Sequence, residues 1–255
     1  MSIAELNRAI ETGDLDVALR IYQPLSQDLN IPEDARARSA LRLSVAFRNK
    51  GNFEQADALY RSMEGLGNSE EVASTRARAA FNLFESYRKS DELGRAAEIL
   101  STMAKLLQSD DIKLLRAMAA VNLVESLSAK GDAGGARAAY EEMATIGKSE
   151  ELNTIRATAA NFLLEAYEAL GDYGSAKDIF DSLGSMGVGD SEDVSIACAG
   201  ACVIMARICV KVGKVDEAKS YFHLVSDLEQ KFPYLWERKD EVFSVLYEAT
   251  GEVEF

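Results

Sequence analysis

Small and apolar residues recur along the chain with a period of about 40 residues. The period is clearest when it is counted from the glycine of the segment Gly51-Asn52-Phe53. The matching positions are Gly13, Gly51, Asp91, Gly131, Gly171, Gly213 and Gly251. An alanine follows five residues later at Ala18, Ala56, Ala96, Ala136, Ala176 and Ala218. A ring or a leucine follows nine residues later at Tyr22, Tyr60, Leu100, Tyr140, Phe180 and Phe222. A fixed period in this range indicates a solenoid of repeated units.

The positions before each glycine are in register as well. Eight residues upstream lie Leu43, Leu83, Leu123, Leu163, Met205 and Phe243. In one repeat, Ala80, Leu83 and Tyr87 are spaced i, i+3, i+7 and therefore share one helix face. Ala96 and Leu100, spaced i, i+4, mark a second helix. The glycine position between them ends the first helix, because glycine accepts the left-handed backbone conformation. Each repeat is therefore predicted to be a helix–turn–helix hairpin.

The hairpins follow one another along the whole sequence, which predicts an all-α fold. Full hairpins are expected at 31–66, 69–107, 109–147, 149–187 and 191–229. A shortened helix at 1–12 with its partner at 14–29 precedes them. A final helix at about 234–249 is expected to turn Phe243 and Tyr247 inward and to cap the array. Residues 1–255 are thus predicted to form a single domain.

A serine followed by acidic residues precedes four of the predicted first helices. These segments begin at Ser69, Ser109, Ser149 and Ser191. A serine at this place caps the helix N-terminus, and the acidic side chains favour the positive end of the helix dipole. The first helix of one repeat is therefore predicted at about 70–89, with a length of about 30 Å. The long period is explained by a long first helix.

The arrangement of small and large positions around each glycine resembles the tetratricopeptide repeat (TPR) family over nearly the whole chain. Two features depart from that family, whose usual period is about 34 residues and whose proline after the second helix is absent here. The resemblance implies a right-handed superhelical solenoid whose first helices line a concave groove. It also implies that this groove holds peptide ligands.

Composition and charge change the expected partners. The chain has 255 residues and a formal net charge of −14. A surface of this charge repels nucleic acid and anionic membranes, so we expect neither as a partner. Met1-Ser2-Ile3 leads into a helix without the apolar stretch of a signal peptide, and the three cysteines suggest no disulfide framework. We therefore expect a cytoplasmic location.

One apolar run, from Val194 to Val210, has the composition of a short membrane span. It is also in register with the first helices of the other repeats. We interpret it as a buried helix rather than a membrane span.

No set of residues suggests catalysis, so we expect a non-enzymatic protein without cofactor or metal. The single histidine, His223, is predicted to be a partly buried helix residue next to Phe222. Cys198 and Cys202 have the i, i+4 spacing of two metal ligands on one helix face. We favour the alternative, that the cysteines are small buried apolar residues.

The face opposite the packed stripe of the first helices is the candidate binding surface. Arg78, Asn82 and Glu85 point about 200° away from that stripe at about 100° per residue. The TPR resemblance implies that Asn82 and Asn122 hydrogen-bond the backbone of a ligand. The predicted groove consists of Arg38, Arg42, Arg78, Asn82, Glu85, Asn122, Glu125, Glu165 and Arg207.

Charges in this predicted groove differ from one end to the other. Residues 31–50 carry five basic and two acidic side chains, whereas residues 150–170 carry one basic and four acidic ones. Glu85, Glu125 and Glu165 form a row of like charges, which repel one another and so favour a functional role. A solvated face with chance charges is the alternative. A ligand is expected to place acidic groups toward the N-terminal repeats and basic groups toward the middle ones.

A second row of charges is interpreted as structural. It consists of Arg36, Arg76, Arg116 and Arg156, each four residues before the stripe alanine of its repeat. These side chains lie on the buried side and are expected to pair with acidic side chains or helix-end carbonyls of neighbouring repeats.

We therefore predict a scaffold that binds a segment of a partner protein in its concave groove. Two alternatives stay open. The array could assemble with itself into homo-oligomers, or it could be a regulatory sensor whose pitch changes when a short peptide binds.

Overall fold

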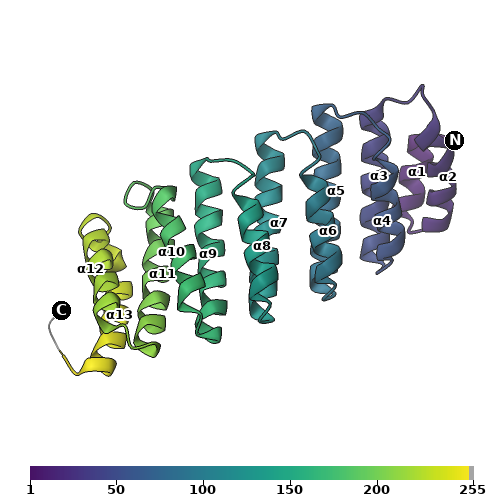
Figure 1. Ribbon diagram of the computed structural model, residues 1–255. Coiled ribbons are helices and arrows are strands. Elements are labelled where there is room, and N and C mark those ends of the chain that lie inside the picture. The colour runs from purple at the N-terminus through teal and green to yellow at the C-terminus, as the bar shows by residue number, and fades with distance from the viewer. Residues whose placement is uncertain (253–255) are drawn as a thin grey trace. The chain divides into compact units, whose positions relative to one another are not determined.

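The computed structural model describes residues 1–252, and these residues form an all-α solenoid of helix hairpins (Figure 1). The helices are α1 (Ile3–Glu11), α2 (Leu15–Gln27), α3 (Glu33–Asn49), α4 (Phe53–Ser62), α5 (Glu70–Lys89), α6 (Leu93–Met103), α7 (Asp110–Ala129), α8 (Ala133–Met143), α9 (Glu150–Leu170), α10 (Tyr173–Leu183), α11 (Glu192–Lys211), α12 (Val215–Lys231) and α13 (Trp236–Thr250). Short 3₁₀ turns lie at Gly184–Met186 and Pro233–Leu235. The predicted hairpins are confirmed to within a few residues.

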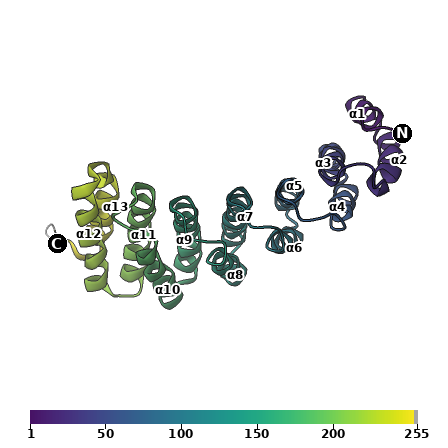
Figure 2. The ribbon, with the colours of Figure 1, turned by 90° about the horizontal axis from the view of Figure 1, so that it is seen from above.

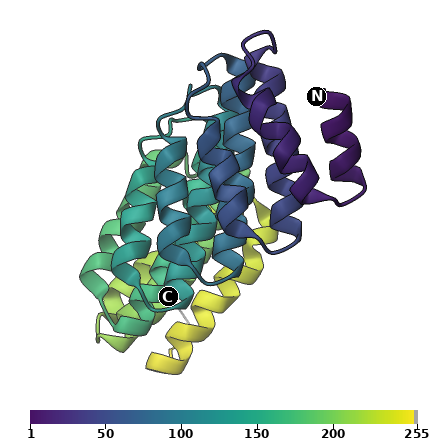
Figure 3. The ribbon, with the colours of Figure 1, turned by 90° about the vertical axis from the view of Figure 1, so that its right-hand side faces the viewer.

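The chain divides into two compact units, which are described separately. Unit 1 spans residues 1–119 and unit 2 begins at Ala120, so that α7 contributes its first half to one and its second half to the other. In unit 1, α1, α3 and α5 form a row of first helices, with α2, α4 and α6 in a second row (Figure 2). The hairpin of α1 and α2 lies at the purple end of the chain (Figure 3). In unit 2, α11 packs against α9, α12 and α13. The single domain and the right-handed superhelix stay predictions.

A residue with positive φ ends the first helix of each hairpin and the final helix α13. Glycine occupies this position at Gly13, Gly51, Gly131, Gly171, Gly213 and Gly251, with φ between 69° and 78°. Asp91 takes the same conformation with φ 67°. Because this left-handed region is unfavourable for residues with a Cβ atom, glycine is the residue that closes these turns at the lowest cost.

The alanine of each second helix is where the two helices of a hairpin touch. All six alanines of this register are fully buried. In the α3–α4 hairpin the Ser44 hydroxyl donates to the backbone carbonyl of Ala56 at 3.0 Å, which places the two helices in close contact. The large residue nine positions after the glycine is buried at Tyr22, Tyr60, Leu100 and Tyr140. At Phe180 and Phe222 it is partly exposed, contrary to the repeat pattern.

Tyrosine hydroxyls connect the second helices of successive hairpins. Tyr22 bonds Ser62 at 2.9 Å, Tyr60 bonds Thr102 at 2.6 Å, and Tyr140 bonds Ser182 at 2.7 Å. The three acceptor hydroxyls each donate to a carbonyl three residues earlier in their own helix. Because a hydroxyl has one proton to donate, the tyrosine is the donor in each pair. Burial raises the pKa of all three tyrosines, which keeps the donating proton in place.

The repeated arginines lie beside these tyrosines. Arg36 donates from Nη1 to the carbonyl of Ser26 at 3.1 Å, near the end of α2, as the sequence predicted. The Arg156 guanidinium lies 5.4 Å from the centre of the Tyr140 ring. Arg36 and Arg116 are buried. The row is therefore part of the packing between hairpins in each unit.

The long first helices begin where their serines predicted, with one exception. The Ser69 and Ser149 hydroxyls accept from the backbone N–H groups of Val72 and Leu152. α7 begins directly after Ser109, whose carbonyl accepts from the Lys113 N–H at 2.9 Å.

Ser191 was wrongly predicted to be a side-chain cap. It makes no such bond, and its carbonyl instead accepts from the Ser195 hydroxyl at 2.7 Å. The loop that precedes α11 explains the difference. In this loop Gly187 and Gly189 have positive φ, and the Ser191 N–H donates to the Gly187 carbonyl.

α11 is a core helix of unit 2. It is long and apolar enough to cross a membrane by length and composition, but most of its side chains are buried inside the unit. Its contacts with α9, α12 and α13 account for that composition. At one of them, Asn161 donates to the Ala197 carbonyl at 3.0 Å beside Gly200, where a Cβ atom would meet the amide. Cys198, Cys202 and Cys209 are buried here, as predicted.

The register predicted for the final helix was wrong. In α13, Val242 and Leu246 are fully buried, whereas Phe243 is partly exposed and Tyr247 is 49% exposed. The cause lies at its start, where the 3₁₀ turn at Pro233–Leu235 changes how the helix faces α11 and α12. The displaced rings stack on each other instead, 6.1 Å apart.

We predict that Tyr60→Phe destabilises the protein by about 1 kcal/mol, because it removes a partly buried hydrogen bond between two hairpins. Urea unfolding monitored by circular dichroism measures the difference. Tyr247→Phe is the matched control, since this exposed hydroxyl makes no hydrogen bond in the described residues. Equal stability of Tyr60→Phe and the wild type would show that the hydroxyl connection contributes nothing.

Candidate functional site

A pocket of about 520 Å³ opens on the row of first helices in unit 1. It is lined by Ile10, Leu41, Arg42, Val45, Arg78, Phe81, Asn82 and Leu115. These residues come from α1, α3, α5 and the first half of α7. Each helix presents the face opposite its buried alanines, which is the face that the helical spacing predicted. The pocket is mainly apolar with a few convergent polar groups, the usual composition of a ligand site.

The polar groups of this pocket differ in the ion pairs and hydrogen bonds that they make with the rest of the protein. Arg78 is exposed and makes no ion pair or hydrogen bond within residues 1–252. Arg42 lies 3.6 Å from Glu11, a long pair between two exposed side chains. The Asn82 side-chain carbonyl accepts from Arg48 at 3.1 Å. Arg78 is thus the cation that is most available to an incoming anionic group.

Two other predicted groove residues of unit 1 lie outside this pocket's lining. Arg38 pairs with Asp34 at 2.6 Å, one helical turn away. Glu85 pairs with Arg88 at 2.9 Å, so that its charge is neutralised within α5. The structure therefore brings together Arg42, Arg78 and Asn82. The apolar lining was missed as a site, although Val45 shares the predicted face.

A second pocket, of about 380 Å³, lies in unit 2. It is lined by Glu125, Ser128, Ala129, Gly131, Phe162, Glu165, Ala166, Ala169 and Leu170. It contains two predicted residues, Glu125 and Glu165, which are both exposed. Phe162 occupies the repeat position that Asn82 holds in unit 1, so the same register supplies a ring here and an amide there.

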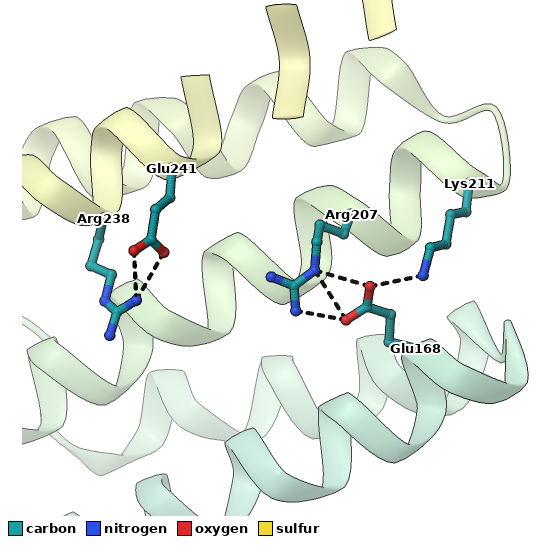
Figure 4. A network of polar contacts seen from close by, with 5 residues as sticks. All are labelled: Glu168, Arg207, Lys211, Arg238 and Glu241. Carbon is teal, nitrogen blue, oxygen red and sulfur yellow. Dashed lines mark hydrogen bonds and ion pairs between the residues drawn. The ribbon is translucent and has the colours of Figure 1, made fainter. Parts of the chain in front are cut away.

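Arg207 and Asn122 lie outside this lining. Asn122 is partly exposed on α7 and accepts from the Ser126 hydroxyl through its backbone carbonyl. Arg207 makes a two-pronged contact with Glu168, at 2.9 Å from Nε and 2.7 Å from Nη2 (Figure 4). Lys211 donates to the same carboxylate at 2.8 Å. Glu168 was missed by the sequence analysis, although it lies one helical turn after Glu165.

This carboxylate connects two helices of unit 2 electrostatically. Burial acts to raise the pKa of Glu168, but the hydrogen bonds from Arg207 and Lys211 outweigh it and hold the pKa below the ordinary value. Glu168 in turn raises the pKa of Arg207. Arg238 and Glu241 form a separate pair within α13 (Figure 4). Arg207 is therefore already paired with Glu168 of the adjacent helix α9.

A third pocket, of about 320 Å³, lies between the second helices of unit 1 around Tyr87. Its charged residues are largely paired with neighbours. Arg61 contacts Asp57 at 2.9 Å, and Arg95 contacts Glu92 at 3.3 Å while lying over the Tyr87 ring. These pairs favour a structural role for this pocket.

Reactive side chains are scattered in the described part of the chain. No group of three or more His, Cys, Asp or Glu in residues 1–252 has the arrangement of a metal site. Cys198 hydrogen-bonds Cys202, and burial raises the pKa of Cys202 well above its ordinary value. His223 is exposed rather than partly buried as predicted, because α12 turns Tyr221 and Val225 inward instead.

The comparison with known families agrees with the repeat architecture. The family model described as the PPR repeat matches residues 201–227. The match runs from α11 through the turn at Gly213 into α12. It supports a helical repeat related to the TPR type, without naming TPR itself. No curated protein matches the chain. The comparison thus supports a helical-repeat architecture, and repeats of this kind commonly bind RNA or protein.

This match corrects the expected exclusion of nucleic acid. PPR repeats characteristically bind RNA, with two or three side chains of each repeat reading one base. The error came from the net charge, which sums the whole surface and does not describe a local face. Arg42 and Arg78 show that a face of an acidic protein can carry basic groups. The cytoplasmic location stays a prediction.

We predict that Glu168→Gln lowers stability at pH 7 by about 1 kcal/mol, because Arg207 and Lys211 lose their carboxylate partner. The folded state holds the pKa of Glu168 below its unfolded value, so this stabilisation is present above the unfolded pKa. It is lost as the pH falls through the folded pKa.

Chemical unfolding between pH 7 and pH 3 should therefore show the unfolding free energies of the wild type and Glu168→Gln becoming equal toward acid pH. The change should fall within about one to two pH units of the ordinary glutamate pKa. Glu248→Gln, at an exposed carboxylate of α13, is the control for a plain charge change. A difference that stays constant over this range would show that the carboxylate's charge is not what stabilises the contact.

Proposed function

We propose that the protein is a non-enzymatic scaffold whose unit 1 pocket binds a segment of a partner protein. The segment combines a large apolar side chain with a carboxylate, either a free C-terminus or an acidic residue. The observation that carries this proposal is the unpaired, exposed Arg78 at the edge of a largely aliphatic pocket. The finer assignment to the TPR type rests on the buried alanine and ring positions of the repeats.

The chemistry of the pocket supports a carboxylate ligand. A guanidinium presents a planar fork of N–H groups that matches the two oxygens of a carboxylate. Arg42 supplies a second guanidinium in the same pocket, weakly held by Glu11. The Asn82 amide nitrogen makes no hydrogen bond within the described residues and is a suitable donor to a ligand carbonyl.

The apolar part of the pocket favours a protein segment over RNA. Ile10, Leu41, Val45 and Leu115 are aliphatic, and burying an aliphatic or aromatic side chain against them contributes about 25 cal/mol per Å². Unpaired RNA bases are held mainly by stacking on aromatic rings, of which this pocket has one, Phe81. RNA is the competing ligand class and is tested in parallel with peptides.

The test is a selection on immobilised full-length protein. One pool contains synthetic peptides of random sequence, about ten residues long with free carboxyl ends. A parallel pool contains random single-stranded RNA. We expect enriched peptides to carry an acidic residue or the terminal carboxylate next to Leu, Ile, Met or Phe.

Individual enriched peptides are then titrated by fluorescence anisotropy. We expect Arg78→Glu to weaken their binding at least about tenfold, equivalent to about 1.4 kcal/mol. Arg38→Glu changes the charge equally outside the pocket and should leave affinity within about twofold. Enrichment of RNA that Arg78→Glu abolishes would assign the pocket to nucleic acid instead. A peptide pool without acidic enrichment would refute the proposal.

A further inference from the structure

We propose that the unit 2 pocket is a second binding site, specific for a protein segment that carries a lysine or arginine next to a large apolar side chain. This inference rests on the proposed function, because it takes the chain to be a scaffold for protein segments. It adds a second pocket of opposite charge, built in unit 2 from residues of α7, of the turn that follows it and of α9.

The apolar part of this pocket is open. Leu170, at the C-terminal end of α9, is 61% exposed, and the Phe162 ring lies on the same lining. Ala129, Ala166 and Ala169 leave space between them because their side chains are short. An exposed leucine and an aromatic ring on one concave lining are favourable for burying an apolar side chain of a partner.

The two acidic residues at this pocket lack the neutralising neighbour that Glu85 has at the same repeat position. Arg88, three residues after Glu85, pairs with it at 2.9 Å. At the corresponding position after Glu125 the chain carries Ser128, and after Glu165 it carries Glu168. Glu125 and Glu165 accordingly make no ion pair within residues 1–252, and both are exposed.

The nearby cations of unit 2 are already engaged. Arg207 and Lys211 both contact Glu168, which leaves Glu165 without a direct partner from α11. Two like charges on one pocket repel each other, and a ligand cation placed between them relieves that repulsion. The charge of the pocket therefore selects for a positively charged group.

Ser128 supplies an independent observation. Its Oγ atom is buried and has no hydrogen-bond partner among the described residues, although the residue lines the pocket. A buried hydroxyl without a partner is unfavourable, and an N–H donor on an incoming side chain or backbone would satisfy it.

The same charges decide between ligand classes. The phosphates of RNA would be repelled by Glu125 and Glu165, and a lone metal ion would not use the apolar half of the pocket. A lysine or arginine side chain suits both halves, because its methylene groups pack on apolar surface while the charged end reaches the carboxylates.

The test uses the same random peptide and RNA pools on the full-length wild type and on the double variant Glu125→Gln, Glu165→Gln. We expect the wild type to enrich a second peptide class in which Lys or Arg adjoins Leu, Phe, Met or Tyr. In anisotropy titrations the double variant should bind these basic peptides at least about tenfold more weakly.

The matched control is the double variant Glu237→Gln, Glu248→Gln, which removes the same charge from exposed positions of α13. It should bind the basic peptides within about twofold of the wild type. Leu170→Ser tests the apolar half without changing charge and should also weaken binding. Thermal unfolding should show the Glu125, Glu165 variant at least as stable as the wild type, because it removes a repulsion.

The outcomes separate this inference from the proposed function. Arg78→Glu should weaken the binding of acidic peptides and leave the affinity for basic peptides unchanged. The Glu125→Gln, Glu165→Gln variant should weaken the binding of basic peptides and leave the affinity for acidic peptides unchanged. If only acidic peptides are enriched, the unit 1 proposal stands and the unit 2 proposal is overturned. If only basic peptides are enriched, the unit 1 proposal alone is overturned. The unit 2 proposal is also overturned if basic peptides bind the Glu125→Gln, Glu165→Gln variant as tightly as the wild type. The same holds if the pocket binds RNA and this variant abolishes that binding.

Discussion

The architecture depends on one close contact, between a buried alanine of each second helix and the first helix of the same hairpin. At Ala56 this contact is close enough for Ser44 to donate a buried hydrogen bond to the alanine's own carbonyl. A larger side chain would push the helices apart and would leave the buried Ser44 hydroxyl without its partner. The tyrosine hydroxyls then connect one hairpin to the next within each unit, and the opposite faces of the first helices carry the two pockets.

Most of the fold could be predicted because the signals that begin and end its helices are local in the sequence. A glycine in the left-handed conformation ends a first helix, and a serine followed by acidic residues begins the next one. These features depend on the residues themselves and hardly on tertiary context. Prediction failed where the local pattern was interrupted. The glycine-rich loop before α11 replaced the Ser191 cap, and the turn at Pro233 changed the inward face of α13, which exposes Tyr247.

The candidate sites were predictable only in part. Helical spacing placed Arg42, Arg78 and Asn82 on one face, and the structure gathers them in one pocket. Which charges remain available could not be read from that spacing, since it depends on side-chain contacts. Arg88 neutralises Glu85, and Glu168 occupies Arg207, whereas Glu125 and Glu165 have no such neighbour. The exclusion of RNA failed for a related reason, because a net charge contains no information on a local face.

The most direct test of the account is the stability of Ala56→Leu, measured by urea unfolding against Ala58→Leu. Both substitutions add the same atoms to α4, but Ala56 is fully buried in the hairpin contact and Ala58 is exposed. The account predicts that Ala56→Leu loses about 1–3 kcal/mol of stability through overpacking, while Ala58→Leu changes stability by less than about 0.5 kcal/mol. Equal stability of the two variants would contradict the claim that this contact sets the spacing of the helices.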